Sequence, residues 1–368
     1  MHWIRAALLL LAVLLLGVMA AAARADEVVL TNGNKFEGEI TSKKGEFPIV
    51  IKTKGGKLTF PERLVKSVKR DGSDEGAKKP VGGGARQPRE PRERPEQPRA
   101  GGGEQVEDMN WLQLRRSYKT KLLRKGAAPG KFTNPDPKML PPGVTPVTYR
   151  SGPLKLKGWV VRDPRAPTGP GLVYFHGGGA LNLGDSVQIC TPFVSAGFAV
   201  FFPALRGENG NPGIHELAAG EVDDAVAAVK WLAKQTYVKQ NAVHALGYNL
   251  GGLVASLLSL SPAARLASSA SVDGLYAPKA FAAFGDQLPF NPRIKQEAYL
   301  RSMIPHRHQM RHTHYAYVSK RSQIMQLALD ELRDDPRRKQ LKLKVVMSAG
   351  QGEAMLREAV QDYLRRIQ

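Results

Sequence analysis

The sequence predicts an α/β domain, with a mainly parallel sheet and helices on both faces, preceded by a small β-barrel. From Val144 onward, short apolar runs alternate with segments of helical periodicity, an order that is typical of a parallel sheet covered by helices. Residues 221–235 carry apolar side chains at the spacing of a helix with one buried face. The barrel is predicted by short alternating strands within residues 26–70.

Residues 1–25 have the composition of a secretory signal. His2 and Arg5 precede the apolar run Ala6–Ala22, and Ala23-Arg24-Ala25 forms a small-x-small cleavage site. We therefore expect an exported protein (periplasmic, cell-surface or extracellular) that is cleaved after Ala25. The alternative is that residues 6–22 remain as a membrane anchor.

The chain is strongly basic, with a formal net charge of +21. Such a balance favours anionic partners, and for an exported protein these are surface polymers or an acidic membrane face rather than DNA. No specific nucleic-acid recognition is expected, and a solvated basic surface is the simpler interpretation. The single cysteine, Cys190, has apolar neighbours on a predicted helix, so we expect it in the core and the fold without an internal disulfide.

Residues 26–70 are predicted to form the SH3-like or Sm-like barrel. Asn32-Gly33 and Gly55-Gly56 supply hairpin turns, and residues 30–40 resemble small barrels at the start of exported bacterial proteins. No residue cluster in this part suggests chemistry, so we interpret it as a binding or spacing module. Strands are predicted at Val28–Leu30, around Phe36–Ile40, and at Ile49–Lys52, Leu58–Phe60 and Val65–Val68.

A linker and a basic segment are predicted between the barrel and the α/β domain. Residues 71–108 are rich in Gly, Pro and Arg, which predicts a disordered linker; a polyanion-binding arm is the alternative. Residues 109–143 are predicted to form a basic amphipathic helix over 109–126 and a Pro-rich approach. We expect Trp111 and Leu112 to pack this helix onto the following domain, with contact to an acidic membrane surface as the alternative.

The predicted domain at residues 144–368 opens with a hairpin and continues with alternating strands and helices. Strands are predicted at Val147–Arg150, Leu154–Arg162, Gly171–Phe175, Phe198–Pro203, Asn241–Gly247, Ala267–Asp273, Tyr315–Ser319 and Leu343–Met347, and helices at Glu221–Gln235 and Glu353–Ile367.

Four motifs on these elements resemble the α/β-hydrolase fold, in particular its exported prolyl-oligopeptidase-like and dienelactone-hydrolase-like branch. They are Phe175–Gly179 (F-H-G-G-G), Leu205–Gly213 (L-R-G-E-N-G-N-P-G), Gly220–Asp224 (G-E-V-D-D) and Gly247–Gly252 (G-Y-N-L-G-G). The resemblance implies that the last motif is the nucleophile elbow, in which a serine follows a strand and precedes a helix.

Asparagine occupies the position at which this fold carries its nucleophile. A carboxamide has no acidic proton to lose, so Asn249 cannot perform the acyl transfer of a serine, although asparagine tolerates the positive φ of the elbow. The resemblance places Gln351 where the histidine belongs, and glutamine is no general base. No carboxylate follows the strand Tyr315–Ser319. Asp273 is either a displaced triad acid or a residue that caps its turn.

The backbone donors of the oxyanion hole do not depend on these side chains. The resemblance assigns them to Gly177, Gly178 and Leu250, and such donors beside a carboxamide would suit a small carbonyl or carboxylate ligand. His176 is expected to be structural. The segment His306–His314 contains two H-x-H pairs, but interleaved arginines oppose a metal ion. We expect a basic loop over the pocket mouth, and neither a metal nor a cofactor.

These residues predict a hydrolase relative that has lost its activity and acts as a binding or scaffolding protein. The first alternative is an active esterase or peptidase with a non-standard site. The second is a polyanion-binding protein that acts through the barrel and the arm.

Overall fold

The structure, a computed structural model, describes residues 26–30, 35–46, 49–53, 56–60, 65–70, 73–76, 110–129, 140 and 143–368. The chain divides into two compact units, Met1–Gln97 and Pro98–Gln368. The predicted signal sequence, most of the predicted linker and most of the Pro-rich approach lie outside the described residues. Among the described helices, none is long and apolar enough to cross a membrane.

The first unit contains a small antiparallel sheet with its own apolar core. Its described strands follow the order β4-β3-β2-β1-β5-β6, and Val28, Ile40, Ile49 and Ile51 are buried between them. This agrees with the expected small β domain, and its classification as an SH3-like or Sm-like barrel stays a prediction. The strands are β1 (Asp26–Leu30), β2 (Lys35–Ile40), β3 (Ile49–Thr53), β4 (Gly56–Phe60), β5 (Val65–Arg70) and β6 (Ser73–Gly76).

Strand β6 was not predicted. It pairs with β5 through Val68 and Glu75, so the boundary of the predicted linker at residue 71 is too early. The polar sequence Ser-Asp-Glu-Gly gives no apolar alternation to detect, and its pairing comes from backbone hydrogen bonds to an edge strand.

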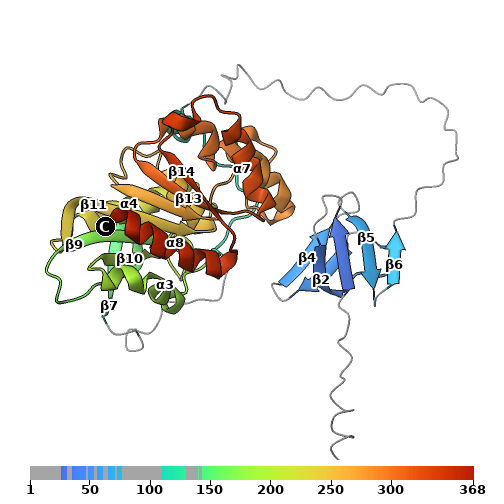
Figure 1. The fold of residues 1–368 in the computed structure, drawn as a ribbon, viewed down its shortest axis with the longest axis horizontal. Coiled ribbons are helices and arrows are strands. Elements are labelled where there is room, and N and C mark those ends of the chain that lie inside the picture. Colours follow the sequence, from blue (N-terminus) through green and yellow to red (C-terminus); the bar gives the residue numbers. More distant parts are fainter. Residues whose placement is uncertain are drawn as a thin grey trace, which may run out of the picture. The chain divides into compact units, whose positions relative to one another are not determined.

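The second unit contains an eight-stranded sheet with the order β14-β13-β12-β11-β9-β10-β8-β7 (Figure 1). The strands from β9 to β14 run parallel, whereas β7 and β8 form the predicted antiparallel hairpin at one edge. The strands are β7 (Val144–Ser151), β8 (Leu154–Val161), β9 (Gly169–Phe175), β10 (Ala199–Pro203), β11 (Val238–Tyr248), β12 (Ser268–Val272), β13 (Thr313–Ser319) and β14 (Leu343–Ser348).

Helices cover both faces of this sheet, as predicted. Successive side chains of a strand point to opposite faces, so along β10 Phe201 joins the core under α4 and α5, while Val200 and Phe202 join the core under α3 and α8. Cys190 is buried on α3. The helices are α3 (Leu183–Ser195), α4 (Gly220–Ala233), α5 (Leu250–Leu258), η3 (Pro278–Gln287), α6 (Lys295–Leu300), η4 (Ile304–Gln309), α7 (Gln323–Arg333), η5 (Arg338–Gln340) and α8 (Gly352–Ile367).

The segment before the sheet packs onto the second unit and is helical over a shorter range than predicted. Helix α2 (Trp111–Ser117) ends at Tyr118, whose backbone is extended. Beyond it the hydroxyls of Tyr118 and Thr120 and the N–H of Lys121 donate to the carboxylate of Glu297 at 2.6–2.7 Å. An extended chain can present these donors to one carboxylate, which explains why the predicted helix over 109–126 is wrong after residue 117.

Trp111 anchors α2. Its side chain is 1% exposed, and its indole N–H donates to the carbonyl of Leu300 at 3.1 Å. The compact unit therefore includes residues before Val144, the position at which the α/β domain was predicted to begin.

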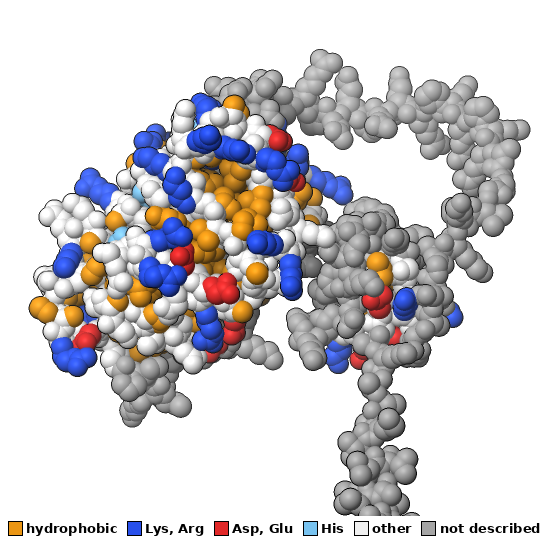
Figure 2. All heavy atoms as spheres, in the orientation of Figure 1, with side chains coloured by type: hydrophobic (Ala, Val, Ile, Leu, Met, Phe, Trp, Pro, Cys, Tyr) orange, Lys and Arg blue, Asp and Glu red, His pale blue; other side chains and the backbone are white. Residues whose placement is uncertain are grey.

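Lys and Arg side chains are spread over the visible face of the second unit, with apolar side chains between them (Figure 2). The charge on this face is distributed rather than gathered over one element. A distributed charge is typical of a solvated basic surface.

Candidate active site

The chain turns sharply between β11 and α5, and Asn249 is the residue at the turn. Its backbone has φ 50° and ψ −113°, a strained combination that few residues other than glycine adopt. The N–H of Asn249 donates to the carbonyl of Val272 at 2.8 Å, which ties the turn to the neighbouring strand β12. The predicted strand–turn–helix and its positive φ are therefore present.

The glycines around Asn249 are required by close backbone contacts. A Cβ atom on Gly247 would lie 2.0 Å from the carbonyl oxygen of Gly251, and one on Gly251 would lie 2.2 Å from the carbonyl oxygen of Phe175. These distances leave no space for a methyl group. The G-x-N-x-G spacing thus lets the start of α5 approach both its own strand and the end of β9.

Two of the predicted oxyanion residues lie on the loop that faces this turn. Gly178 has a φ of +83°, and Tyr248 packs against the Cα of Gly177 so closely that a Cβ there would lie 2.6 Å from its ring. The N–H of Gly251 donates to the carbonyl of His176 at 3.1 Å, so that donor is already used. Leu250 is the first residue of α5, where backbone N–H groups have no partner within the helix.

Asp273 and Gln351 lie at the same edge of the sheet as Asn249. Asp273 follows β12 with a φ of 49°; its Oδ1 atom is buried without a hydrogen-bond partner, and burial raises the pKa of its carboxyl. Gln351 is the exposed residue before α8. Neither lines the cavity that contains Asn249.

A histidine–glutamate pair joins the loops after β9 and β10. His176 Nε2 lies 3.0 Å from Oε2 of Glu208, and both side chains are buried. Burial lowers the pKa of His176, but the neighbouring carboxylate outweighs this effect and holds the pKa above 6.5. Glu208 Oε2 also accepts the N–H of Leu205 at 2.7 Å. The pair therefore fixes the predicted structural histidine against the neighbouring loop.

A second pair joins the loop before α4 to the first turn of that helix. His215 Nδ1 lies 3.1 Å from Oε1 of Glu221, an ion-pair contact without good hydrogen-bond alignment, because Nδ1 lacks a hydrogen-bond partner. Glu221 Oε1 also accepts the N–H groups of Glu216 at 2.6 Å and Leu217 at 3.1 Å. Oε2 of Glu221 is buried without a partner.

The charges of this second pair stabilise each other. Burial lowers the pKa of His215, but Glu221 outweighs burial, so the pKa of His215 lies above its ordinary value of 6.5. Burial raises the pKa of Glu221, but His215 and the N–H of Glu216 outweigh that effect, so it lies below 4.5. Glu221 stays ionised near neutral pH and makes His215 a stronger base.

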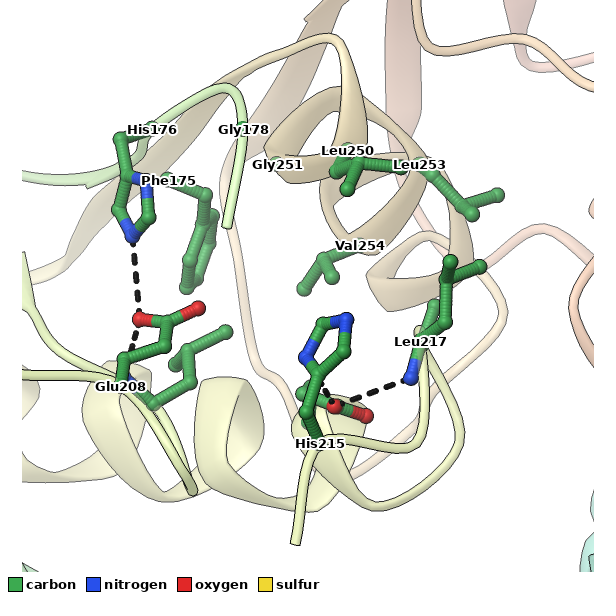
Figure 3. A pocket seen from close by; sticks show the side chains of 13 residues that line it. Phe175, His176, Gly178, Glu208, His215, Leu217, Leu250, Gly251, Leu253 and Val254 are labelled. Atoms are coloured by element: carbon green, nitrogen blue, oxygen red, sulfur yellow. Dashed lines mark hydrogen bonds and ion pairs between the residues drawn. The ribbon is translucent and has the colours of Figure 1, made fainter. Parts of the chain in front are cut away.

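Two cavities share His215 as a lining residue, and Figure 3 shows the residues of the smaller one. The inner one measures about 20 Å³ and is lined by both histidine–glutamate pairs and the start of α5, a volume that is large enough for one water molecule. The outer one measures about 450 Å³ and is lined by Asn249, Leu250 and aromatic side chains. In Figure 3 the His215 ring lies between Val254 and Leu217. The site thus combines a histidine whose pKa is raised by a carboxylate, a water-sized space and a cavity large enough for an organic group.

The prediction for the histidines of residues 306–314 is wrong. His306, His312 and His314 are buried rather than exposed over the pocket, because His312 and His314 hydrogen-bond to Ser269 and Ser271 on β12 at 2.7–2.8 Å. His312 and His314 lie beside the beginning of β12, at the opposite edge of the sheet from Asn249. Within the described residues, no group of three His, Cys, Asp or Glu side chains could hold a metal ion.

His215 was missed by the sequence analysis, as was its pairing with Glu221. The available signal was a histidine next to the Leu205–Gly213 loop, followed by a carboxylate at the start of a predicted helix. The two meet because Leu217 and Ala218 both have positive φ values, 56° and 64°. Leucine and alanine rarely adopt a positive φ, so the sequence gives no indication of this turn.

Comparisons with known proteins agree on a hydrolase. Residues 105–367 match the family described as X-Pro dipeptidyl-peptidase (S15 family). The uncharacterized peptidase YtmA of Bacillus subtilis (strain 168) is 29% identical over 133 residues, which cover 35% of this chain and 50% of that protein. The matched region thus spans half the length of this relative.

Solved structures share the fold. The Pyrococcus furiosus esterase Pf2001 has a TM-score of 0.50 and 16% identity, covering 66% of this chain and 98% of its own. The Pyrococcus horikoshii acylaminoacyl peptidase has a TM-score of 0.47 and 15% identity, covering 62% of this chain and 41% of its own. The first of these likenesses establishes the α/β-hydrolase fold.

These findings contradict the prediction of an inactive binding or scaffolding protein. The matching family is a peptidase family, and it covers residues 105–367, which are most of the second unit. The prediction failed because it considered serine chemistry alone, at Asn249 and Gln351. The histidine–glutamate pairs provide acid–base groups that do not depend on those two positions.

Proposed function

The chain belongs to the X-Pro dipeptidyl-peptidase (S15) family, and we propose that it is an active hydrolase of esters or peptides whose base is His215. The carboxylate of Glu221 lies 3.1 Å from Nδ1 and stabilises the imidazolium, and Nε2 is the nitrogen to which we assign the proton transfer. Water replaces the serine nucleophile, because Asn249 occupies the elbow. The carboxamide of Asn249 and the N–H of Leu250 would hold the substrate carbonyl.

The reaction proceeds in two steps. The water oxygen adds to the carbonyl carbon while one water proton passes to Nε2 of His215, and the carbonyl oxygen becomes an oxyanion. The N–H of Leu250 stabilises this oxyanion. The bond to the leaving alcohol or amine then breaks, the imidazolium returns the proton to the leaving atom, and a carboxylic acid remains.

One observation supports this mechanism above the others: His215 lies in the wall between a water-sized cavity and the cavity of Asn249. A general base must be within reach of a water molecule that itself can reach the substrate. The buried, unpartnered Oε2 of Glu221 gives such a water a further hydrogen-bond acceptor.

We also propose an ancestry, a location and a kind of surface partner for this protein. Asn249, Asp273 and Gln351 would mark the triad positions of an ancestral serine hydrolase of the prolyl-oligopeptidase-like branch. The replacement of the serine by water as the nucleophile would explain why the triad residues are no longer present. The enzyme would act outside the cytoplasm after cleavage of its signal. Its basic surface would hold it near anionic polymers or an acidic membrane face.

The proposal is tested with the protein of residues 26–368 and p-nitrophenyl butyrate. We expect turnover above a heat-inactivated control, no labelling by a fluorophosphonate, and no burst, because no acyl-enzyme forms. Equal rates with native and inactivated protein would refute hydrolase activity. A burst or a covalent acyl adduct detected by mass spectrometry would refute the direct attack of water and indicate a nucleophile on the protein.

A further inference from the structure

We infer that Arg301 is a positioning residue of this site: it holds the turn of residues 216–218 in the conformation that brings Glu221 to His215. Its effect on the rate rests on the proposed function, in which His215 is the base. Arg301 is not among the described residues that line the two cavities, so it would act through the turn and not on the substrate.

The turn has a strained backbone. Leu217 and Ala218 have φ values of 56° and 64°, and left-handed backbone is unfavourable for residues that carry a Cβ atom. Such strain persists only where the surrounding contacts impose it. Both residues also line the inner cavity, so a relaxed turn would change the site itself.

Two opposite charges impose this conformation. Arg301 Nε donates to the carbonyls of Leu217 at 2.7 Å and Glu216 at 3.2 Å, and its Nη2 donates to the carbonyl of Glu216 at 2.8 Å. Glu221 Oε1 accepts the N–H groups of the same two residues. The peptide group between Glu216 and Leu217 therefore has a cation at its carbonyl and an anion at its N–H, and both charges favour the same orientation.

One carboxylate serves both the turn and the histidine. Dashed lines in Figure 3 join His215 and Leu217 to the carboxylate of Glu221. If the turn relaxed, this carboxylate would lose the N–H groups that fix Oε1 at 3.1 Å from Nδ1 of His215. Among the described residues, Glu208 and Arg301 also act on the charge of His215, and a lysine at position 301 would leave both of these charges in place.

Arg301 is itself held firmly. Its side chain is fully buried; Nη1 donates to Oε2 of Glu297 at 2.5 Å, and Nη2 donates to Oγ1 of Thr120 at 2.8 Å. The guanidinium carbon lies 3.9 Å from the ring centroid of Phe290. A planar guanidinium can make all these contacts at once, whereas the ammonium of a lysine is a compact point charge. Arg301→Lys therefore keeps the charge beside Glu297 and loses the fork that holds the turn.

Arg301→Lys tests this role in the protein of residues 26–368. NMR titration of the imidazole protons measures the pKa of His215, whose signal is assigned by its loss in His215→Asn. We expect this pKa to fall, because burial then acts against a weaker carboxylate contact. We expect kcat/KM for p-nitrophenyl butyrate to fall by about tenfold or more, because the base is misplaced. An unchanged pKa of His215 in the folded variant would overturn the inference, whatever its rate.

A second substitution should rescue the first. Glycine adopts a positive φ without strain, so Ala218→Gly in the Arg301→Lys protein should restore part of both the pKa of His215 and kcat/KM. No recovery of either in the folded double variant would overturn the inference. The matched control is Arg115→Lys, because Arg115 donates to the carbonyl of Ala219 at 3.1 Å and to Asp223 at 2.7 Å, next to the turn but outside it. This control should change neither quantity, and a change as large as that in Arg301→Lys would also overturn the inference.

The NMR titration separates this inference from the proposed function. A lowered pKa of His215 that Ala218→Gly restores, in proteins that do not hydrolyse p-nitrophenyl butyrate, would refute the function and support the role of Arg301. If Arg301→Lys does not fold, Arg301→Met with Glu297→Gln removes both buried charges, an exchange that proteins often tolerate. Hydrogen–deuterium exchange of the Leu217 amide then replaces the titration: faster exchange would support the inference, and unchanged exchange would overturn it.

Discussion

The two edges of the parallel sheet both carry buried or half-buried histidines, but the partners of these histidines differ. At the carboxyl edge, His176 and His215 contact the carboxylates of Glu208 and Glu221. At the amino edge, His312 and His314 contact the hydroxyl groups of Ser269 and Ser271. The partner decides what each histidine can do.

A carboxylate partner compensates for burial, whereas a hydroxyl does not. The pKa of His215 lies above 6.5 because Glu221 outweighs its burial. Burial alone dominates at the other edge and lowers the pKa of His314 to about 3. The first kind of histidine can exchange protons near neutral pH, and the second remains neutral and serves the fold.

The comparison predicts its largest effect for His215→Asn. Loss of a general base costs about a hundredfold or more in rate, so kcat/KM for p-nitrophenyl butyrate should fall by at least that factor. The melting temperature should also fall, because the buried carboxylate of Glu221 loses its charged partner, so activity is compared at a temperature at which both proteins are folded. If the folded variant retains more than a tenth of the wild-type activity, His215 is not the base.

His314→Leu is expected to lower the free energy of unfolding and to leave kcat/KM unchanged. This change leaves the hydroxyl of Ser271 buried without its partner, which costs about 2–3 kcal/mol. Urea unfolding should show the loss, while kcat/KM of the folded protein stays unchanged. Adding Ser271→Ala removes the stranded hydroxyl and should restore about 1 kcal/mol; no recovery would mean that the network does not hold this region together.

Acidic pH should distinguish the two edges within one protein. Hydrolysis requires neutral His215, so kcat/KM should fall as the pH decreases through a midpoint above 6.5. Stability should also decrease with acid, because His314 binds its proton at about pH 3 when folded and near 6.5 when unfolded. Its stabilising effect is complete above 6.5 and declines between these values.

Glu221→Gln tests whether the carboxylate of Glu221 raises the pKa of His215 and thereby sets the midpoint of the pH profile of kcat/KM. The glutamine oxygen can still accept the N–H groups of Glu216 and Leu217, so the loop should keep its path. Without the negative charge the pKa of His215 should fall, and the activity profile should move to lower pH with a rate about tenfold lower. An unmoved midpoint would assign it to another group.

The smallest effect is expected for His308→Asn. His308 Nε2 lies 2.8 Å from Asp335 Oδ2, and the histidine side chain is 29% exposed. Asp335 also contacts Arg307, so it keeps a cationic partner. Partly exposed ion pairs contribute about 0–1 kcal/mol. The free energy of unfolding should therefore stay within about 0.5 kcal/mol of wild type, and kcat/KM should stay unchanged. A large loss of activity would extend the active site beyond the carboxyl edge.

Sequence patterns predicted the part of the molecule that depends on local periodicity. The strands from β7 to β14, helix α4 and the turn at Asn249 follow from alternating or helical spacing of apolar residues and from glycines at fixed offsets. These signals lie within about ten residues of one another, so they can be read without the fold.

The missed features depend either on distant partners or on unusual local backbone conformations. Helix α2 ends early because Glu297 accepts hydrogen bonds from Tyr118 and Thr120, about 180 residues away in the chain. The pairing of His215 with Glu221 depends on left-handed backbone at Leu217 and Ala218. His314 looked like a surface residue because its serine partners occupy another strand.

Residues 110–129 are an integral part of the second unit, although they precede its sheet. Glu297 and Arg301 are fully buried against each other, and Thr120 donates to the first and accepts from the second. A chain that began at Val144 would leave Glu297 paired with Arg301 but would remove the hydrogen bonds that Tyr118, Thr120 and Lys121 donate to the carboxylate of Glu297. It would also lose the wall formed by Arg124, Lys125 and Pro129. Residues 124–129 thus form part of the wall of the outer cavity, so a shortened protein that keeps this cavity must retain the segment anchored by Trp111.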